Sequence, residues 1–342
     1  MYPTNGISKI QKQQMVSCQS SNVKVVGVDG NFDDCQRMVK KLLNDDKFKH
    51  EILKSHAVTL NTANSINWGR ILPQILFHMV NINFQNSNIS SSHFSNFQHN
   101  YLEMVNLGFI HLGQKVDLCI PTGNFGNILS ALYAKKMDIP FNQIISASNQ
   151  NKVLHDFFTT GIYDLQDRPL IKTVSPAIDI LVSSNLERLL WTHLGSKRVQ
   201  ELMESLKNQR FFQVTPEELQ RILSTENLKS GFCTEQDCKD TMKQVWNQDK
   251  YMVDPHTAVA IKVAESHQGS NPMLIASTAH YSKFVEECQD IFDDIDEVIE
   301  NPAKHQGIEE CKEKDVVHTD TVQADYDQVC NKLKQFVHRY FQ

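Results

Sequence analysis

Short apolar runs followed by stretches of helical periodicity recur along this 342-residue chain. The clearest example is the apolar run that ends at Pro121, after which apolar residues recur at helical spacing from Ile128 to Tyr133. A short continuous apolar run predicts a buried strand, and a spacing of three and four residues predicts a helix. Strands that alternate with helices predict a mostly parallel sheet whose ligands bind at the carboxyl ends of the strands. The predicted fold class is therefore α/β.

The same order of strand and helix is predicted at three other places. After the first of these strands, Asp33 or Asp34 is the predicted cap of the helix. The second is followed by a helix that has an Asn cap and ends at Gly161. The three predicted strands are residues 23–28, 144–147 and 273–276.

A further helix is predicted from about Ser65, with a kink at Pro73. Residues 81–100 hold six Asn and five Ser, which is typical of a surface loop or an insertion. Residues 192–250 have helical periodicity with little strand character, which predicts an inserted helical subdomain. The predicted apolar face of the helix after Ser65 consists of Trp68, Ile71, Leu72, Ile75 and Leu76.

Composition narrows the classes of ligand. The chain has a formal net charge of −6, is 40% apolar and 22% charged, and has no basic patch interleaved with aromatic residues. These features argue against nucleic acid as the main partner, and a small molecule is the expected ligand. No stretch approaches the roughly 18 consecutive apolar residues of a membrane-spanning helix, so no membrane partner is expected.

The eight cysteines are spread along the chain without the spacing of a disulfide framework, which indicates free thiols in a reducing compartment. Cys233 and Cys238 are the only pair close in sequence, and no matching pair of cysteines or histidines follows them. Two incidental thiols are thus a better interpretation than a zinc site, and no metal is predicted. The predicted compartment is the cytoplasm. The mitochondrion stays open, because a presequence would lie upstream of Met1.

Residues 119–136, CIPTGNFGNILSALYAKK, join the strand that ends at Pro121 to the helix after it. Glycines such as Gly123 and Gly126 let a backbone come close to a ligand. The free N–H groups and the positive end of the helix dipole favour an anion, most simply a phosphate. The alternative is that the Gly and Asn residues only make a tight turn.

Residues 254–260, DPHTAVA, have a complete structural interpretation. Asp254 is a predicted helix N-cap, Pro255 takes the first helical position, and the alanine and valine side chains pack inward. His256, and His280 further along the chain, can act as an acid or a base, or can have a packed, hydrogen-bonded structural role. The structural role is the preferred interpretation.

Six segments resemble, in chain order, the signature segments of the threonine synthase family, including its branch called threonine synthase-like 1. They are NSINWGRILPQ (64–74), PTGNFGNILSALYAKKMDIP (121–140), SASNQNKVLHDFFTTGIYD (146–164), VSPAIDILVSSNLERLLW (174–191), DPHTAVAIKVA (254–264) and STAHYSKF (277–284). The resemblance runs through almost the whole chain. It implies a fold type II α/β architecture of the tryptophan synthase β type, incomplete at the N-terminus and with a helical insertion, and it implies pyridoxal phosphate as the cofactor.

The resemblance also implies roles for particular residues. Thr278 matches the family position whose hydroxyl faces the pyridine nitrogen, and its alternative is an ordinary threonine at a strand end. Asn67 and Arg70 are candidates for contact with a phosphorylated substrate, because arginine offers a forked donor to phosphate. Arg70 is equally interpreted as a surface charge beside a structural Trp68. The residues that would hold the cofactor phosphate through backbone N–H groups at the helix N-terminus are Gly123, Asn124, Phe125, Gly126 and Asn127.

The chain departs from the family pattern at its start. In threonine synthases, the lysine that holds the cofactor and the Ser-Gly-Asp-Thr-Gly loop after it precede the segment YPTNGISKIQKQQM, which here follows Met1. Pyridoxal chemistry needs that lysine as its covalent anchor, so no catalytic residue is assigned within residues 1–342. Lys9 and Lys12 lie in a segment matched to a non-catalytic part of the family and do not substitute for it.

Two functional hypotheses follow. In the preferred one, the chain is the C-terminal part of a longer pyridoxal-phosphate protein, expected to act as a phospho-lyase on O-phosphohomoserine or a similar small phosphorylated amino acid. In the second, the chain is a non-catalytic binding or regulatory protein that retains the phosphate pocket. The two differ in whether the lysine-bearing segment is encoded upstream of Met1.

The expected domain organisation follows from the resemblance and from the order of the elements. The closing helix has an apolar face that predicts docking on the body of the protein or on a second subunit, so a homodimer stays open. The expected parts are residues 1–60 as a remnant of the smaller α/β domain, residues 61–191 with 251–300 as the cofactor-binding α/β domain, residues 192–250 as the helical insertion, and residues 301–342 as a C-terminal linker and helix.

Overall fold

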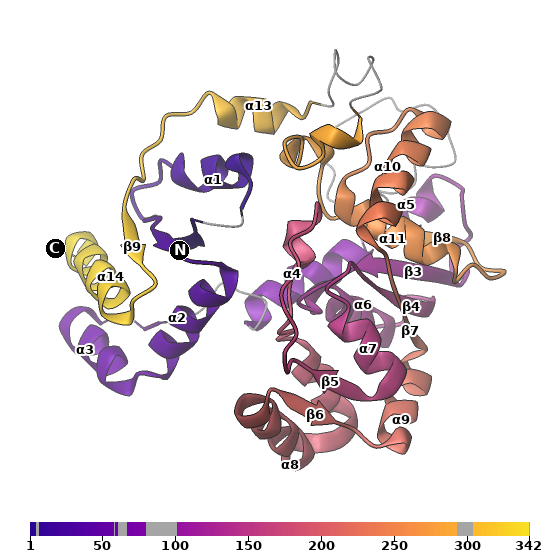
Figure 1. Cartoon of the computed structure of the whole chain (residues 1–342), viewed down its shortest axis with the longest axis horizontal. Coiled ribbons are helices and arrows are strands. Elements are labelled where there is room, and N and C mark those ends of the chain that lie inside the picture. The colour runs from indigo at the N-terminus through magenta and orange to yellow at the C-terminus, as the bar shows by residue number, and fades with distance from the viewer. Residues whose placement is uncertain (5–6, 58, 61–66, 80–100, 293–303, 342) are drawn as a thin grey trace. The chain divides into compact units, whose positions relative to one another are not determined.

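The computed structural model describes residues 1–4, 7–57, 59–60, 67–79, 101–292 and 304–341 (Figure 1). The chain divides into two compact units. Unit 1 comprises residues 1–63, 282–287 and 301–342, and unit 2 comprises residues 64–281 and 288–300. The predicted loop at residues 81–100 and the predicted helix start at Ser65 lie outside the described residues. No described helix is long and apolar enough to span a membrane.

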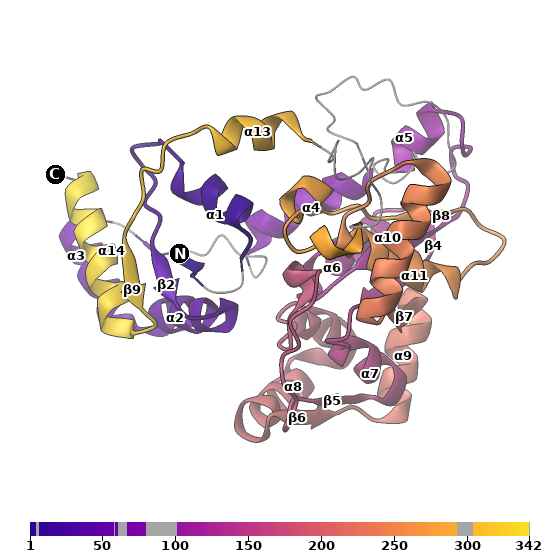
Figure 2. The same ribbon diagram turned by 45° about the horizontal axis from the view of Figure 1, so that its top comes forward.

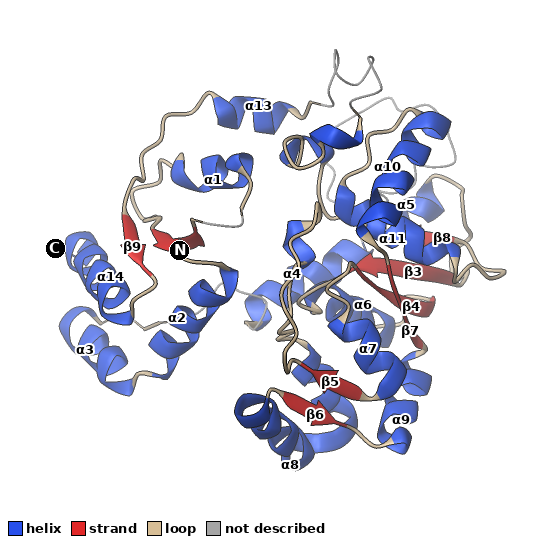
Figure 3. Cartoon of the chain, viewed as in Figure 1, coloured by secondary structure: helices blue, strands red, loops and turns tan. Residues whose placement is uncertain are grey.

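The centre of unit 2 is a four-stranded parallel sheet in the order β7-β4-β3-β8 (Figure 3). Every residue of β3 is buried, since a parallel strand covered by helices on both faces has no exposed side. The sheet and its helices confirm the predicted α/β class. The strands are β3 (Val116–Pro121), β4 (Phe141–Ser148), β7 (Leu228–Phe232) and β8 (Met273–Ile275).

Helices cover both faces of this sheet (Figure 2). On one face, α6 (Gly126–Lys136) and α7 (Val153–Thr160) pack on β4, and Leu118 and Ile120 belong to their core. On the other face, α11 (Pro255–Glu265) packs across all four strands. The Sγ of Cys119 lies 3.3 Å from the carbonyl oxygen of Ala260 in α11. Successive residues of β3 thus point to opposite layers, as the pleat of a strand requires.

Helix α4 (Trp68–Met79) packs on α6 and has Pro73 in its interior, as predicted. Only part of its predicted apolar face is buried. Ile71 and Ile75 are buried in the core, whereas Trp68, Leu72 and Leu76 are 51%, 56% and 51% exposed. Trp68 still stacks on Tyr133 of α6, with ring centroids 5.2 Å apart. The five residues span more of the helix circumference than one neighbouring helix covers.

Residues 192–250 are not wholly helical, which corrects the sequence interpretation. Strand β7 lies within them and pairs with β4 as an edge of the sheet. A second strand, β6 (Phe211–Gln213), pairs antiparallel with β5 (Ile162–Asp164). β7 reads LKSGF, which has no β-branched residue and no strict alternation, so its strand character comes from pairing with β4. The helices here are α8 (Leu186–Gln209), which bends at Gly195, α9 (Pro216–Glu226) and α10 (Glu235–Asp249).

Unit 1 holds a three-stranded parallel sheet in the order β1-β2-β9. The helix predicted after the first strand is α2, and its Cys35, Met38 and Leu42 are buried. Its N-cap is Asn31, and Asp34 completes a capping box as the third helical residue, so neither predicted aspartate is the cap. The elements are β1 (Tyr2–Pro3), β2 (Gly27–Asp29), β9 (Thr321–Gln323), α1 (Lys9–Val16), α2 (Phe32–Asn44), α3 (Asp46–His56), α13 (Gln306–Lys312) and α14 (Tyr326–Phe341).

The ends of α7 and α11 test the predicted caps. Helix α7 ends at Gly161, whose φ of 76° is left-handed, as predicted. Its N-cap is Lys152 and has no side-chain cap, so the predicted Asn cap is wrong. Asp254 caps α11 by accepting from the backbone N–H groups of His256 and Thr257, with Pro255 at the first position, which confirms that prediction.

Candidate functional site

The connections between strands cross the sheet of unit 2 in opposite directions from β3, toward β4 on one side and toward β8 on the other. From β3 the chain moves through α6 to β4 on one side, and it reaches β8, on the other side of β3, from α11 on the opposite face. Loops that leave neighbouring parallel strands in opposite directions leave a crevice at the carboxyl ends of the strands, and this is where open α/β sheets bind ligands. The segments that meet at this crevice are residues 122–127 after β3 and residues 276–280 after β8.

Residues 122–127, named the glycine loop here, present backbone donors at the crevice. Phe125 has a φ of 63° and is the N-cap of α6 without any side-chain cap. Among the described residues, none accepts a hydrogen bond from the N–H groups of Gly123, Phe125, Gly126 or Asn127. The positive end of the α6 dipole lies at the same place. These donors suit an anion, and neither the glycine loop nor residues 276–280 contain an acidic side chain that would repel it.

Gly123 lies close to another part of the backbone. A Cβ atom built on it would lie 3.0 Å from the Cα and 3.2 Å from the carbonyl oxygen of Ile178, and 3.2 Å from the Cβ of Ile180. Ile178 belongs to the short 3-10 turn Pro176–Ile178, which therefore packs directly against the loop. Glycine is required at this position by contact with another backbone, not by an unusual φ.

Asn124 fixes the shape of the loop by hydrogen bonds to residues that precede α8. Its Oδ1 accepts from the backbone N–H of Ser184 at 3.0 Å and from the Ser184 hydroxyl. Its carbonyl oxygen accepts from the backbone N–H and the Nδ2 of Asn185, at 3.2 and 3.0 Å. The side-chain oxygen of Asn124 thus faces the protein, which leaves the backbone as the part of the loop that can meet a ligand.

Tyr163 holds the residues just before Ser184 in place. Its hydroxyl donates to the carbonyl oxygen of Leu181 at 2.6 Å and accepts from the backbone N–H of Ser183 at 2.8 Å, and its ring is buried. These two bonds hold residues 181–183, which lead to Ser184 and Asn185. The sequence analysis did not single out Tyr163, because its two partners are backbone groups about 20 residues away.

Replacing Tyr163 with phenylalanine is expected to lower the free energy of unfolding by about 1–3 kcal/mol, because it leaves a buried carbonyl and a buried N–H without their partner. Denaturant unfolding of the purified chain measures the change. Tyr133→Phe is the matched control, since the Tyr133 hydroxyl makes no hydrogen bond to a described residue and its ring still stacks on Trp68. An equal loss in both variants would contradict the expectation.

Thr278 lies three residues beyond the end of β8, and its side chain is exposed. The preceding strand is locked to β3, since Ile275 pairs with Cys119 and the N–H of Ala276 donates to the Cys119 carbonyl oxygen at 2.9 Å. The structure thus brings Thr278 and the glycine loop, 150 residues apart, to the ends of two adjacent strands. The role of Thr278 toward a cofactor stays a prediction.

Ser148 is a polar group at the same edge that the sequence analysis did not identify. It ends β4, the strand beside β3, and its buried Oγ has no hydrogen-bond partner among the described residues. A buried hydroxyl without a partner is rare and often marks a ligand or water position. The sequence feature that could have identified Ser148 as a candidate site residue is its place at the end of a buried strand, directly before Asn149.

Asn67 and Arg70 flank Trp68 at the start of α4. The guanidinium of Arg188 lies 5.7 Å from the Trp68 ring and donates to the Oδ1 of Asn185, the residue that contacts Asn124. Trp68 stacks on Tyr133, late in α6, whereas His78 at the other end of α4 reaches Asn127 at the start of α6. The two helices therefore run antiparallel. The side-chain oxygen of Asn67 accepts from the N–H of Gly69 at 2.8 Å, and Arg70 is exposed. A role in substrate binding stays a prediction for both.

His78 is a buried imidazole against the first turn of α6. Its Nε2 lies 3.1 Å from the Oγ of Ser130 and 3.3 Å from the carbonyl oxygen of Asn127. Burial lowers the pKa of His78 from its ordinary value of 6.5 to about 4, because the charged form loses its hydration. His78 is therefore uncharged at neutral pH and links α4 to the helix that carries the glycine loop.

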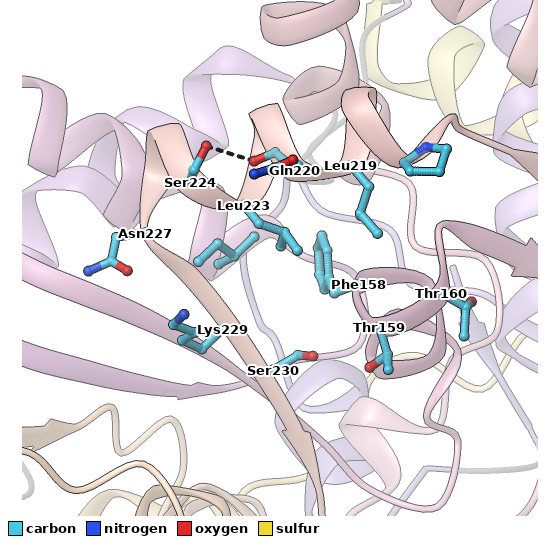
Figure 4. Close-up of a pocket in the computed structure, with 12 residues that line it drawn as sticks. Phe158, Thr159, Thr160, Leu219, Gln220, Leu223, Ser224, Asn227, Lys229 and Ser230 are labelled. Carbon is cyan, nitrogen blue, oxygen red and sulfur yellow. Dashed lines mark hydrogen bonds between the residues drawn. The ribbon is translucent and has the colours of Figure 1, made fainter.

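A groove of about 740 Å³ opens elsewhere in unit 2, between the end of α7, α9 and the edge strand β7 (Figure 4). Lys229 is the only charged residue among those that line it, and none of the predicted site residues is among them. The groove lies along the outer edge of the sheet and not at the carboxyl ends of β3 and β8. Within the described residues there is no group of three or more His, Cys, Asp or Glu side chains able to hold a metal ion.

No family model matches the chain. Threonine synthase-like 1 of Homo sapiens is 43% identical over 288 residues, which make up 83% of this chain and 36% of that protein. Threonine synthase of Saccharomyces cerevisiae is 32% identical over 308 residues, which make up 84% of this chain and 54% of that protein. The chain therefore spans about a third to a half of the length of these relatives.

Two solved structures are similar over nearly the whole chain. Threonine synthase of Brucella melitensis, described as bound to pyridoxal phosphate, matches with a TM-score of 0.77 and 29% identity, over 98% of this chain and 64% of its own. Threonine synthase from yeast matches with a TM-score of 0.77 and 28% identity, over 99% of this chain and 64% of its own. These matches confirm the predicted fold type II architecture and the predicted partial coverage. Sequence and fold together show that the chain is a relative of the threonine synthase family and of its threonine synthase-like 1 branch.

Proposed function

We propose that the crevice between β3 and β8 binds pyridoxal phosphate. The observation that carries this proposal is the glycine loop at the point where the sheet changes direction, with N–H groups at the start of α6 that have no acceptor among the described residues. Bound there, the cofactor would supply a ring that withdraws electrons from an attached amino acid. The similarity to a threonine synthase described as bound to pyridoxal phosphate supports the choice of ligand.

The residues present fit the cofactor in charge and chemistry. The backbone N–H groups of Gly123, Phe125, Gly126 and Asn127 would hold the phosphate, helped by the α6 dipole. The hydroxyl of Ser148 offers one further donor at the end of β4. Thr278, at the end of the adjacent strand, would place its hydroxyl at the pyridine nitrogen, where a neutral hydrogen bond tunes the electronics of the ring.

The wider activity we propose is that of a phospho-lyase acting on O-phosphohomoserine or a similar phosphorylated amino acid, with this chain as the C-terminal part of the enzyme. The similarity to proteins named threonine synthase and the partial coverage of their length support this assignment. Asn67 and Arg70 are the proposed contacts of the substrate phosphate. The second candidate is a binding or regulatory protein without catalysis, which follows from the lack of a matching cofactor lysine within residues 1–342.

Purified residues 1–342 are expected to bind pyridoxal phosphate weakly, with inorganic phosphate as a competitor, and to form no lysine adduct that borohydride can trap. The N–H donors bind the phosphate, and no covalent anchor is assigned. Equilibrium dialysis and mass spectrometry after borohydride treatment measure both properties. Pyridoxal without its phosphate is the matched ligand control. Equal binding of pyridoxal and pyridoxal phosphate, or a trapped adduct on one defined lysine, would contradict this expectation.

The mass of the polypeptide in its source cells separates the two candidate functions. An immunoblot against residues 326–341, with mass spectrometry of the N-terminus, is expected to show a product much heavier than 39.2 kDa with peptides upstream of Met1. That product would then release inorganic phosphate from O-phosphohomoserine. A product of 39.2 kDa that begins at Met1 would instead support the binding or regulatory protein.

A further inference from the structure

The backbone turn behind the glycine loop is held in place by buried polar contacts. Residues 173–180, named the backing turn here, contain the 3-10 turn Pro176–Ile178, and Ile178 and Ile180 press against Gly123. The shape of the glycine loop therefore depends on where the backing turn sits. Two sets of hydrogen bonds fix that position, and each comes from a different layer of the fold.

The first set joins the backing turn to the segment after β4. Asp179 accepts from the Nδ2 groups of Asn149 and Asn151, at 2.7 and 2.8 Å, and from the hydroxyl of Thr173 at 2.8 Å. Burial raises the pKa of Asp179, although these donors oppose the shift. The Oδ1 atoms of Asn149 and Asn151, which a helix cap would use, accept instead from the backbone N–H groups of Asn151 and Ile171, at 2.9 Å each.

The second set joins the backing turn to α11 through a histidine. The backbone N–H of Ala177 donates to the Nε2 of His256 at 3.0 Å. The Nδ1 of His256 lies 3.0 Å from the Oδ1 of Asp254, and both side chains are at most 2% exposed. Because Nε2 accepts, the ring proton is on Nδ1 and is donated to the carboxylate. Asp254 thereby sets the tautomer that lets His256 hold the backing turn.

The same carboxylate reaches the other side of the crevice. The hydroxyl of Thr257 donates to the Oδ2 of Asp254 and also lies 3.3 Å from the Oγ of Ser277, the residue before Thr278. One buried group thus connects to the backing of the glycine loop through His256 and to the end of β8 through Thr257. An N-cap alone requires only the aspartate, so capping does not explain the histidine.

We propose that His256 is a positioning residue, which holds the backing turn against Gly123 and thereby keeps the N–H groups of the glycine loop aimed at a bound phosphate. The part of this inference that concerns a ligand rests on the proposed function. The part that concerns the loop does not, because it is a statement about the order of residues 121–128 in the protein itself. His256 does not touch the ligand in this arrangement.

Two substitutions separate the contacts of the two ring nitrogens. His256→Asn keeps an N–H donor near the position of Nδ1 for Asp254 but ends short of Ala177. His256→Gln extends an amide oxygen toward the position of Nε2, where it can accept from the Ala177 N–H. Both side chains are polar and fit within the volume of the histidine, so the two variants differ in which of the two contacts they keep, the one with Asp254 or the one with the backing turn.

Hydrogen exchange and ligand binding are measured on the whole chain for wild type and both variants. In His256→Asn, exchange of amides in residues 174–182 and 121–128 is expected to become about tenfold faster, as the loss of one buried hydrogen bond implies. The affinity for pyridoxal phosphate is expected to fall by a similar factor. His256→Gln is expected to restore both toward the wild-type values.

Faster exchange in residues 174–182 with unchanged exchange in residues 121–128 would overturn the inference, because the histidine would then support only its own surroundings. Equal behaviour of the Asn and Gln variants would overturn it as well. If wild type binds neither pyridoxal phosphate nor inorganic phosphate, the proposed function fails. The exchange of residues 121–128 still decides whether His256 positions the loop.

Discussion

Replacing Gly123 with valine is expected to weaken the binding of pyridoxal phosphate by at least about tenfold and to destabilise the fold by about 1–3 kcal/mol, the usual cost of overpacking. The first atom of the new side chain would meet the Cα of Ile178 at 3.0 Å, and a backbone atom cannot rotate away as the end of a long side chain can. Either the glycine loop or the backing turn has to move. Both movements displace the N–H groups that we propose to bind the phosphate.

Equilibrium dialysis with pyridoxal phosphate and denaturant unfolding measure the two effects. Gly307→Val in α13 is the matched control, since a Cβ at that position lies 3.5 Å from the nearest described atom, on the side chain of His305. The control is expected to leave ligand binding unchanged. Unchanged affinity in Gly123→Val would mean that residues 122–127 only make a turn.

Acidification from pH 7 to pH 4 is expected to remove about 3 kcal/mol of stability through His78 alone. The pKa of His78 is about 4 in the folded chain and returns to its ordinary value of 6.5 on unfolding. Between these two values the unfolded chain binds the proton and the folded chain does not. The stability contributed by this group is therefore complete above pH 6.5, is lost as the pH falls from 6.5 to the folded pKa of about 4, and changes little below that.

The comparison that isolates His78 is the difference in unfolding free energy between wild type and His78→Gln, measured at several values of pH. The glutamine does not titrate, so the advantage of wild type at neutral pH is expected to shrink by about 3 kcal/mol at pH 4. His50→Gln in α3 is the control, because the His50 side chain is exposed. A difference between wild type and His78→Gln that does not vary with pH would contradict the buried, uncharged state of His78.

The local pattern of the chain was enough to predict the strand and helix on either side of the glycine loop. Residues 116–121 are apolar except for Asp117 because both faces of β3 are covered, and the glycines after the strand allow a close backbone approach. Asp254 with Pro255 predicted the start of α11 for a similar reason, since capping depends on neighbours in sequence. The order of six motifs predicted the family, which the sequence and structural similarities confirm.

Strand β7 and the true N-caps could not be predicted from the same pattern. β7 has no β-branched residue, and it becomes a strand because β4 offers it hydrogen bonds. Asn149 and Asn151 are good caps in isolation, but Asp179 accepts from the Nδ2 groups of both, and their side-chain oxygens accept from the backbone N–H groups of Asn151 and Ile171. In each case the partner that decides the outcome is distant in sequence, and local propensity carries no information about it.

The sequence by itself determined the strand and helix on either side of the glycine loop and the start of α11, because periodicity, caps and glycines act over a few residues. It also determined the family through the order of its motifs. The tertiary structure alone decided what lies around the candidate site. It placed the change of direction between β3 and β8, brought Thr278 beside the glycine loop, and put His256 behind that loop. The physical reason is that these contacts join residues about 80 to 160 positions apart, whose proximity is set by strand order and burial in the sheet.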